Sequence, residues 1–359
     1  MNETARDLQR ALPLEIPSKP SRAQPDSGLP CLVSKLKGVV TTPVYDTYWW
    51  FAVERQRVFF HQVARRSGPG TTDPVLRTYK FTNAYRASDR VSQFLIRNVI
   101  YSGDTAPSEL FFRTVLFKLF NRISTWELLE RELGRVRWAE YNFKRYDQVL
   151  GAALAAGERI YSAAYIIPPA STFGHEKKHQ NHLRLIERMM ADHLPERLAD
   201  SRSLKNVYTL LRAYPSIGDF LAYQLAIDLN YGPLMDHSES EFVVPGPGAR
   251  DGIRKCFSDT GGWSEADLIR ALAEHQSEEF DRLGLTFSSL WGRPLQLVDC
   301  QNLFCEVDKY ARVAHPEVRG DSKRTRIKQF YRPSLDPIAY WYPPKWGLND
   351  KVARMLEGR

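Results

Sequence analysis

YPSIGDFLAYQLAIDL, residues 214–229, joins two stretches with helical patterns through a short Pro-Ser-Ile-Gly turn. Proline favours the start of a turn, and glycine adopts a positive φ at little cost. We therefore expect one helix to end before Pro215 and another to begin after Gly218, with Gly218 taking the positive φ. The stretch predicts two helices packed as a hairpin, although a plain helix–turn–helix connection has the same pattern.

Helical patterns continue on both sides of this hairpin. Residues 88–102 carry an apolar stripe, and residues 108–121 are apolar nearly all round, which predicts a buried helix. Ser124 and Glu127 have capping-box spacing and predict a helix that ends at Gly134. Strand patterns are scarce, so the expected fold is mainly α. A chain of this length can form one large domain or two lobes, and we expect a two-lobed fold. Further helices are expected near residues 145–160, 175–191, 203–213, 219–229, 249–257, 264–281 and 295–313.

The composition is that of a soluble globular protein with a basic surplus. The 359 residues are 43% hydrophobic and 26% charged, with a net charge of +8. This balance suggests a polyanionic partner, although many proteins with such a charge bind none. The four cysteines lack paired C-x-x-C spacing, which argues against a disulfide framework or a zinc ribbon. The sequence shows no membrane-helix or signal-peptide pattern, so we expect a cytoplasmic protein.

The hairpin resembles that of helix-hairpin-helix DNA glycosylases, whose turn amides bind a DNA phosphate. Ser216 stands where those hairpins usually carry their first glycine. The resemblance implies a catalytic carboxylate shortly after the hairpin, where Asp236, Glu239 and Glu241 stand 18, 21 and 23 residues beyond Gly218. Phe220 stands where bifunctional members carry a Schiff-base lysine, which implies a monofunctional enzyme that activates water.

Three longer stretches carry a closer resemblance: KFTNAYRASDRVSQFLI (80–96), EFVVPGPGARDGIRKCF (241–257) and DCQNLFCEVDKYAR (299–312). They are similar to the alpha-glutamyl/putrescinyl thymine pyrophosphorylase family, whose fold is shared with the helical domain of 5-hydroxymethyluracil DNA kinases. That family is associated with hypermodified pyrimidines in phage DNA. Some bacterial members resemble phage-defence glycosylases that excise glucosylated 5-hydroxymethylcytosine. The resemblance implies a helix-hairpin-helix glycosylase-like core. The sequence has no P-loop, so the phosphoryl transfer of the kinases is not expected.

Residues of these stretches are chemically suited to DNA. The first stretch interleaves cations with aromatic rings, which favours phosphate contact and base stacking. The glycines of PGPGA (245–249) predict a helix entry whose amides bind a phosphate. A basic run near the C-terminus is expected to follow the DNA backbone, although such runs are usually solvated. The predicted DNA contacts are Lys80, Asn83, Arg86, Arg90, Lys177, Lys178, Gly218, Gly246, Gly248, Lys309, Lys323, Arg324, Arg326 and Lys328. The predicted base pocket is Phe81, Tyr85, His179 and Asn302.

A carboxylate is expected to stabilise positive charge on the sugar and to orient water. Glu241 ranks first because of its spacing from the hairpin and its nearness to PGPGA, and Asp236 ranks second. Glu306 and Asp308 are candidates from the third stretch.

HEKKH, residues 175–179, has the spacing of a zinc peptidase helix. A third ligand at the usual position is missing, and Lys177 and Lys178 oppose the binding of a dication. We therefore expect no metal here and assign the two lysines to phosphates.

These predictions combine into one account of the chain. Residues 1–40 form a mobile arm, 41–200 a helical lobe with KFTNAYR, 201–315 a catalytic lobe, and 316–359 a tail packed on the body. The expected function is excision of a flipped hypermodified pyrimidine from double-stranded phage DNA in anti-phage defence, leaving abasic sites, with no cofactor and no obligate protein partner. The alternatives are a non-catalytic module that binds modified DNA, a pyrophosphorylase-type base-modifying enzyme and, last, a metallopeptidase.

Overall fold

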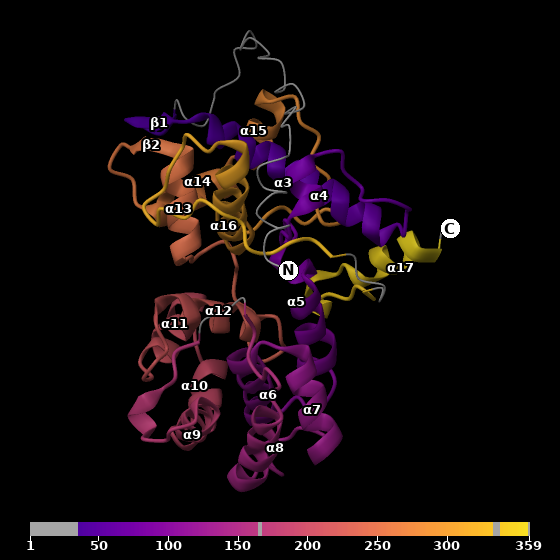
Figure 1. The fold of residues 1–359 in the computed structure, drawn as a ribbon, viewed down its shortest axis with the longest axis vertical. Coiled ribbons are helices and arrows are strands. Elements are labelled where there is room, and N and C mark those ends of the chain that lie inside the picture. Colours follow the sequence, from indigo (N-terminus) through magenta and orange to yellow (C-terminus); the bar gives the residue numbers. More distant parts are fainter. Residues whose placement is uncertain (1–34, 164–166, 333–337, 358–359) are drawn as a thin grey trace.

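The computed structural model describes residues 35–163, 167–332 and 338–357, and this part of the chain is mainly helical, as predicted. Two lobes lie one above the other in Figure 1. Most of the expected N-terminal arm falls outside the described residues. None of the described helices is both long enough and apolar enough to span a membrane.

The upper lobe is built around helix α3 (Pro43–Val63), which packs on α13 and α16. Its N-terminus is capped by Thr42, and an aromatic core that includes Tyr48 and Trp49 lines its buried side. A two-stranded antiparallel sheet closes one edge, with Val39 opposite Thr260. The other elements of this lobe are β1 (Val39–Thr41), α4 (Pro74–Thr78), η1 (Arg86–Ser88), α13 (Pro247–Cys256), β2 (Phe257–Thr260), α14 (Glu265–Glu274), α15 (Gln276–Arg282) and α16 (Leu297–Ala314).

Helices α13 and α16 cross in backbone contact. A Cβ added to Gly252 would lie 2.0 Å from the carbonyl oxygen of Phe304, so only glycine fits at the crossing. The buried ammonium of Lys255 lies 2.9 Å from a carboxylate oxygen of Asp308 on the facing helix. The glycine crossing and this ion pair hold α13 against α16.

The lower lobe surrounds α6 (Pro107–Phe120), the helix predicted to be buried, in which every residue from Glu109 to Phe120 is buried. It packs against helices α9, α10 and α12. The predicted capping box at Ser124 is wrong, because α7 begins at Ile123 and its N-cap is Arg122, two residues before Ser124. The other elements are α7 (Ile123–Leu133), α8 (Phe143–Ala155), η3 (Ser171–Phe173), α9 (Lys178–Ala191), α10 (Leu194–Ala199), α11 (Leu204–Arg212) and α12 (Asp219–Asn230).

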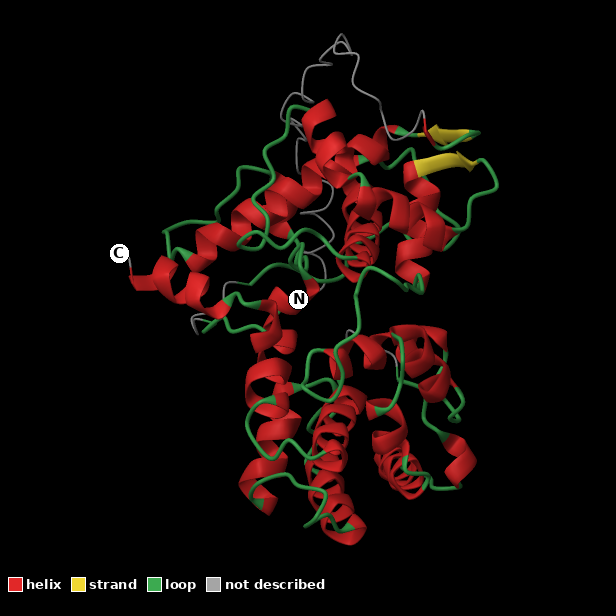
Figure 2. Ribbon diagram, turned by 180° about the vertical axis from the view of Figure 1, so that it is seen from behind, coloured by secondary structure: helices red, strands yellow, loops and turns green. Residues whose placement is uncertain are grey.

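The chain crosses between the lobes twice. It descends through α5 (Arg90–Phe94) and the π-helix η2 (Leu95–Ile100), and the non-helical segment 231–246 returns to α13 (Figure 2). The expected division near residue 200 therefore differs from the observed arrangement, in which α3 joins α13 and α16 while α11 and α12 belong with α6. Packing between segments far apart in sequence produces this difference.

The C-terminal tail packs on the body through its aromatic residues. Tyr342 is fully buried, and its hydroxyl lies 2.8 Å from that of Ser88. Trp346 stacks on Tyr342 and meets Tyr231 edge to face. The tail ends in η4 (Pro344–Trp346) and α17 (Asn349–Glu357).

Candidate functional site

The hairpin quoted at the outset is present: α11 and α12 pack together and are joined by the turn at residues 213–218. Ser216, not Gly218, takes the positive φ, at 64°, while Gly218 has an extended φ of −76°. The prediction for Gly218 is therefore wrong. Ser216 adopts the left-handed conformation at the position where the hairpins it resembles usually carry glycine. A Cβ at Gly218 would meet nothing within 4 Å, so the turn is open at this residue.

Two helix N-termini meet beside this turn. Gly218 is the N-cap of α12 and Gly246 that of α13, and neither helix has a side chain hydrogen-bonded as a cap. A Cβ at Gly246 would lie 2.6 Å from the ring of Phe220, so α13 begins directly on the first turn of α12. Gly248 packs against Cys305 of α16. Adjacent helix N-termini concentrate amide donors and positive dipole ends, which favours an anion such as phosphate.

One acidic side chain lies in the first turn of α12. A carboxylate oxygen of Asp219 accepts a hydrogen bond from Arg212 Nε at 2.6 Å and from the Tyr208 hydroxyl at 3.0 Å. Both partners belong to α11, and the arginine offsets the negative charge. The bonds lower the pKa of Asp219 below its usual range.

Glu241, the first-ranked carboxylate, is exposed on the returning segment. The next residue, Phe242, packs on Tyr208 of α11 and Tyr223 of α12, with ring centroids 5.1 and 6.0 Å away. Arg270 of α14 donates to the carbonyl oxygen of Glu241 at 3.2 Å. Glu241 is thus anchored to the hairpin on one side and to the upper lobe on the other.

Asp236, the second-ranked carboxylate, is also exposed, and one of its oxygens lies 3.3 Å from the ammonium of Lys345. Glu239, between the two, is buried, and its carboxylate lies 3.3 Å from the guanidinium of Arg293. That guanidinium stacks on Trp346 at 3.9 Å. Burial raises the pKa of Glu239, and nearby cations partly offset the shift. In the sequence, Asp236, Glu239 and Glu241 differed mainly in their spacing from the hairpin, so the burial of Glu239 could not be predicted.

Arg86 is buried rather than presented to a ligand. Its Nε, Nη1 and Nη2 donate to Gln224, Tyr231 and Asp228 at 3.0, 2.9 and 2.7 Å. Asp228 also lies 2.8 Å from the ammonium of Lys118. In this conformation the predicted phosphate contact of Arg86 is contradicted, since the guanidinium ties the KFTNAYR stretch to α12.

The four predicted base-pocket residues are not gathered into a pocket. Phe81 and Tyr85 are buried, and the Tyr85 hydroxyl donates to the carbonyl oxygen of Arg293 at 2.6 Å. Asn302 donates to the carbonyl oxygen of Asn83 at 3.1 Å. His179 is fully buried in the lower lobe, 2.7 Å from Asp147.

Two predicted residues of the first stretch have contrasting exposures. Asn83 is buried and accepts a hydrogen bond from Arg55 at 3.0 Å, so its amide serves the fold. Arg90, at the start of α5, is exposed.

The two carboxylates predicted on α16 are engaged inside the upper lobe. Glu306 accepts from the amide of Thr82 at 2.9 Å and pairs with Lys309 at 2.7 Å. The Lys309 ammonium also lies 4.6 Å from the centre of the Phe81 ring. Asp308 is buried, with Lys255, Arg312 and Arg324 around it. These contacts give both carboxylates, and Lys309, a structural role.

The HEKKH stretch does not form a two-histidine helix face. Helix α9 begins at Lys178, so His175 precedes it. Lys177 is exposed, while the ammonium of Lys178 lies over the ring of Tyr161 at 4.2 Å. The other end of α9 faces the hairpin, where Arg188 and Tyr214 line a shared pocket. Among the described residues, no cluster of three or more His, Cys, Asp or Glu side chains is arranged to hold a metal.

The C-terminal basic run lies beside the KFTNAYR stretch. The amide of Lys80 donates to the carbonyl oxygen of Gln329 at 3.0 Å, which places the two segments side by side. Arg324 is tied to Asp251 of α13 at 3.1 Å. We call the exposed cations of these segments the basic strip: Lys80, Lys323, Arg324, Arg326 and Lys328.

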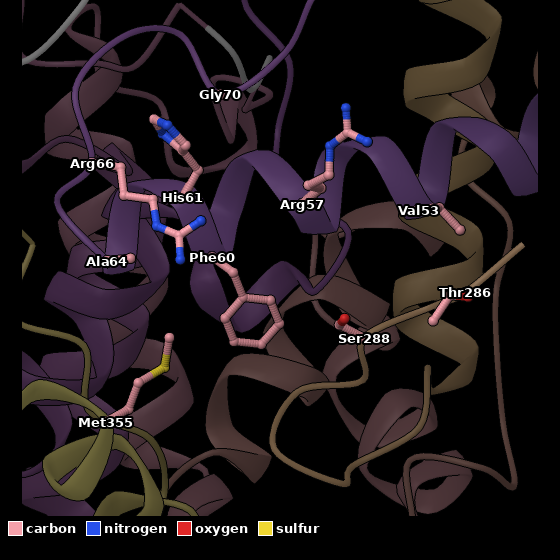
Figure 3. Close-up of a pocket in the computed structure, with 10 residues that line it drawn as sticks. All are labelled: Val53, Arg57, Phe60, His61, Ala64, Arg66, Gly70, Thr286, Ser288 and Met355. Atoms are coloured by element: carbon pink, nitrogen blue, oxygen red, sulfur yellow. The ribbon is translucent and has the colours of Figure 1, made fainter. Parts of the chain in front are cut away.

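A separate pocket of about 590 Å³ lies over helix α3. Figure 3 shows Arg57, His61 and Arg66 on one side of this helix and Phe60 with Met355 on the other. None of the predicted site residues lines it.

These features define a two-lobed helical protein with two adjoining helix N-termini, an exposed carboxylate beside them and a basic strip on the upper lobe. The family described as "5-hmdU DNA kinase, helical domain" matches residues 42–320, and the chain belongs to this family. It is 29% identical over 336 residues to the 5-hmdU DNA kinase of Bacillus phage SP10, covering 88% of this chain and 51% of that protein. The chain thus spans about half the length of this relative. No solved structure matched the chain.

Proposed function

We propose that this protein is a monofunctional DNA glycosylase that excises a hypermodified pyrimidine, such as glucosylated 5-hydroxymethylcytosine, from phage DNA. The observation that carries the proposal is the pairing of the hairpin and the α13 N-terminus through Phe220 and Gly246, with Glu241 anchored beside them. Uncapped amides of two helices bind the backbone next to a flipped nucleotide. The hairpin then acts as a glycosylase-like core, and anti-phage defence follows from removal of the modified base.

The chemistry requires one carboxylate near the sugar. Departure of the base leaves positive charge on the sugar, which a carboxylate stabilises while it orients the attacking water. Glu241 has the exposure and position for this role. Asp236, which is paired with Lys345, is the alternative on the same segment. Glu306 and Asp308 take lower rank because the fold already uses them.

The family relation supports a modified-pyrimidine substrate. The phage relative is a kinase named for 5-hmdU DNA, so a base of this class is a reasonable target for a protein with the same helical domain. The observation that this chain covers only half of that relative also favours a second candidate: a domain that binds modified DNA without cutting it.

Alkali distinguishes the two candidates. DNA containing glucosylated 5-hydroxymethylcytosine is incubated with the protein and then treated with alkali, which breaks the strand at abasic sites. A glycosylase gives breaks at modified cytosines and none in the same sequence carrying plain cytosine. Tight binding to the modified DNA without breaks would identify the non-catalytic domain.

A further inference from the structure

A short backbone bridge holds an aromatic side chain of the C-terminal run against the KFTNAYR stretch. The amide of Lys80 donates to Gln329 at 3.0 Å, and the amide of Tyr331 donates to Thr78 at 2.9 Å. These bonds place Tyr79 opposite Phe330 in an antiparallel bridge. The two residues form the non-hydrogen-bonded type of pair, in which side chains approach most closely.

The Phe330 ring is partly covered by one neighbouring ring. It stacks on Tyr79 with centroids 5.4 Å apart and planes 30° apart. Tyr79 is 3% exposed, whereas Phe330 is 42% exposed. The face turned to Tyr79 therefore contributes to packing, while a large part of the side chain remains in contact with water.

Cations lie on both sides of this ring. In an extended segment, alternate residues share a face at a spacing of about 6.6 Å. Lys328 and Arg332, both exposed, therefore flank Phe330 on its own face. Lys80 follows Tyr79 on the neighbouring segment and therefore lies on the opposite face. An exposed aromatic ring among cations suits single-stranded nucleic acid, in which bases stack on the ring and phosphates meet the cations.

We propose that Phe330 is a stacking site for an unpaired DNA base and that Lys328 and Arg332 bind the adjoining phosphates. The site extends the stack formed by Tyr79 and Phe330 by one base. Only an unpaired base offers a free face, so the ligand is a single strand or the opened part of a duplex. The inference rests on the proposed function, because a flipped nucleotide leaves such an opened segment.

The test compares a labelled oligothymidylate with an oligomer of equal length that keeps the phosphates but lacks the bases. Binding is followed by fluorescence anisotropy over a range of salt concentrations. Phe330→Leu keeps an apolar side chain against Tyr79 and removes the aromatic face. Leu154→Ala, a residue 41% exposed on α8, is the control for loss of an exposed apolar side chain.

Phe330→Leu is expected to weaken binding of oligothymidylate by about five- to 150-fold, the effect of one base stack, and to leave the baseless oligomer unaffected. Lys328→Gln is expected to weaken both oligomers equally and to reduce the salt dependence. An equal effect of Phe330→Leu on both oligomers, or no effect, overturns the stacking site. Base release is assayed separately, so its absence counts against the glycosylase proposal and not against this one.

Discussion

At the scale of single residues, burial separates the charged groups that are exposed to a ligand from those that hold the fold. Arg86 and Glu306 are attractive DNA-binding or catalytic residues in sequence, yet both are committed to internal hydrogen bonds. Glu241 has the same residue type as Glu306 and lies exposed beside the hairpin. Sequence spacing predicted a carboxylate in this segment, but which of its acids is exposed depends on contacts with distant residues such as Arg293.

The first prediction concerns Glu241. Glu241→Gln keeps the shape of the side chain and removes its charge, so it should lower the rate of base release by at least about 100-fold. Binding to modified DNA should change little, because the lost interaction acts mainly in the transition state. Single-turnover base release and gel-shift binding check the two halves. Asp236→Asn is the matched variant. If Asp236→Asn loses most of its base-release rate while Glu241→Gln keeps a normal rate, Asp236 is the catalytic carboxylate and Glu241 is not.

At the scale of elements, the helical patterns predicted most helices because burial of one face repeats with the helical period. Helices α8, α11, α12, α13 and α16 all occur where the pattern placed them. The details of turns were harder to predict. The sequence assigned the positive φ of the hairpin to Gly218, since glycine adopts it most readily, whereas Ser216 takes it in the structure.

The second prediction uses this difference. Ser216→Val places a β-branched residue at φ 64° and should lower the free energy of unfolding by about 1–3 kcal/mol. Gly218→Val has room and an ordinary φ, so it should cost less than about 1 kcal/mol. Urea denaturation of both variants gives the comparison. A larger loss for Gly218→Val would mean that the turn has a different geometry.

The third prediction concerns helix α9. His182 is fully buried, bonded to Tyr161 and Pro168, and burial lowers its pKa to about 4. The folded state therefore favours the neutral ring, so stability is complete above the ordinary pKa of about 6.5 and is lost as pH falls towards about 4. The loss should reach roughly 3 kcal/mol. Urea denaturation across this pH range should show that the free energy of unfolding depends less on pH in His182→Gln than in the wild type. An equal pH dependence in both proteins would refute the lowered pKa of His182.

At the scale of the whole molecule, the fold brings together stretches that the sequence keeps apart. The KFTNAYR stretch meets the C-terminal basic run through the bond between Lys80 and Gln329. Residue patterns reveal helices but not which distant helices pair, so the lobes could not be drawn from sequence. In the proposed function, the basic strip on the upper lobe and the helix N-termini beside the hairpin are the groups that would bind DNA phosphates.

The fourth prediction concerns the basic strip. DNA affinity should fall steeply with salt, and each strip cation that contacts a phosphate of duplex DNA should contribute about 0.9 to the slope of log affinity against log salt. Arg326→Gln is expected to reduce the slope by that amount. Arg86→Gln should instead lower stability and leave the slope unchanged, because Arg86 is buried. Titrations of the protein with DNA at several salt concentrations test this prediction. An affinity that does not change with salt would mean that the basic strip does not contact DNA phosphates.

The central claim is that the N-glycosidic bond of a modified pyrimidine is broken. Mass spectrometry of the small molecules released from several modified phage DNAs tests it most directly. The account predicts free modified base from the wild type, at least about 100-fold less from Glu241→Gln, and none from unmodified DNA. Release of nucleotides, transfer of a group to the base, or no released product from any of these DNAs would contradict it.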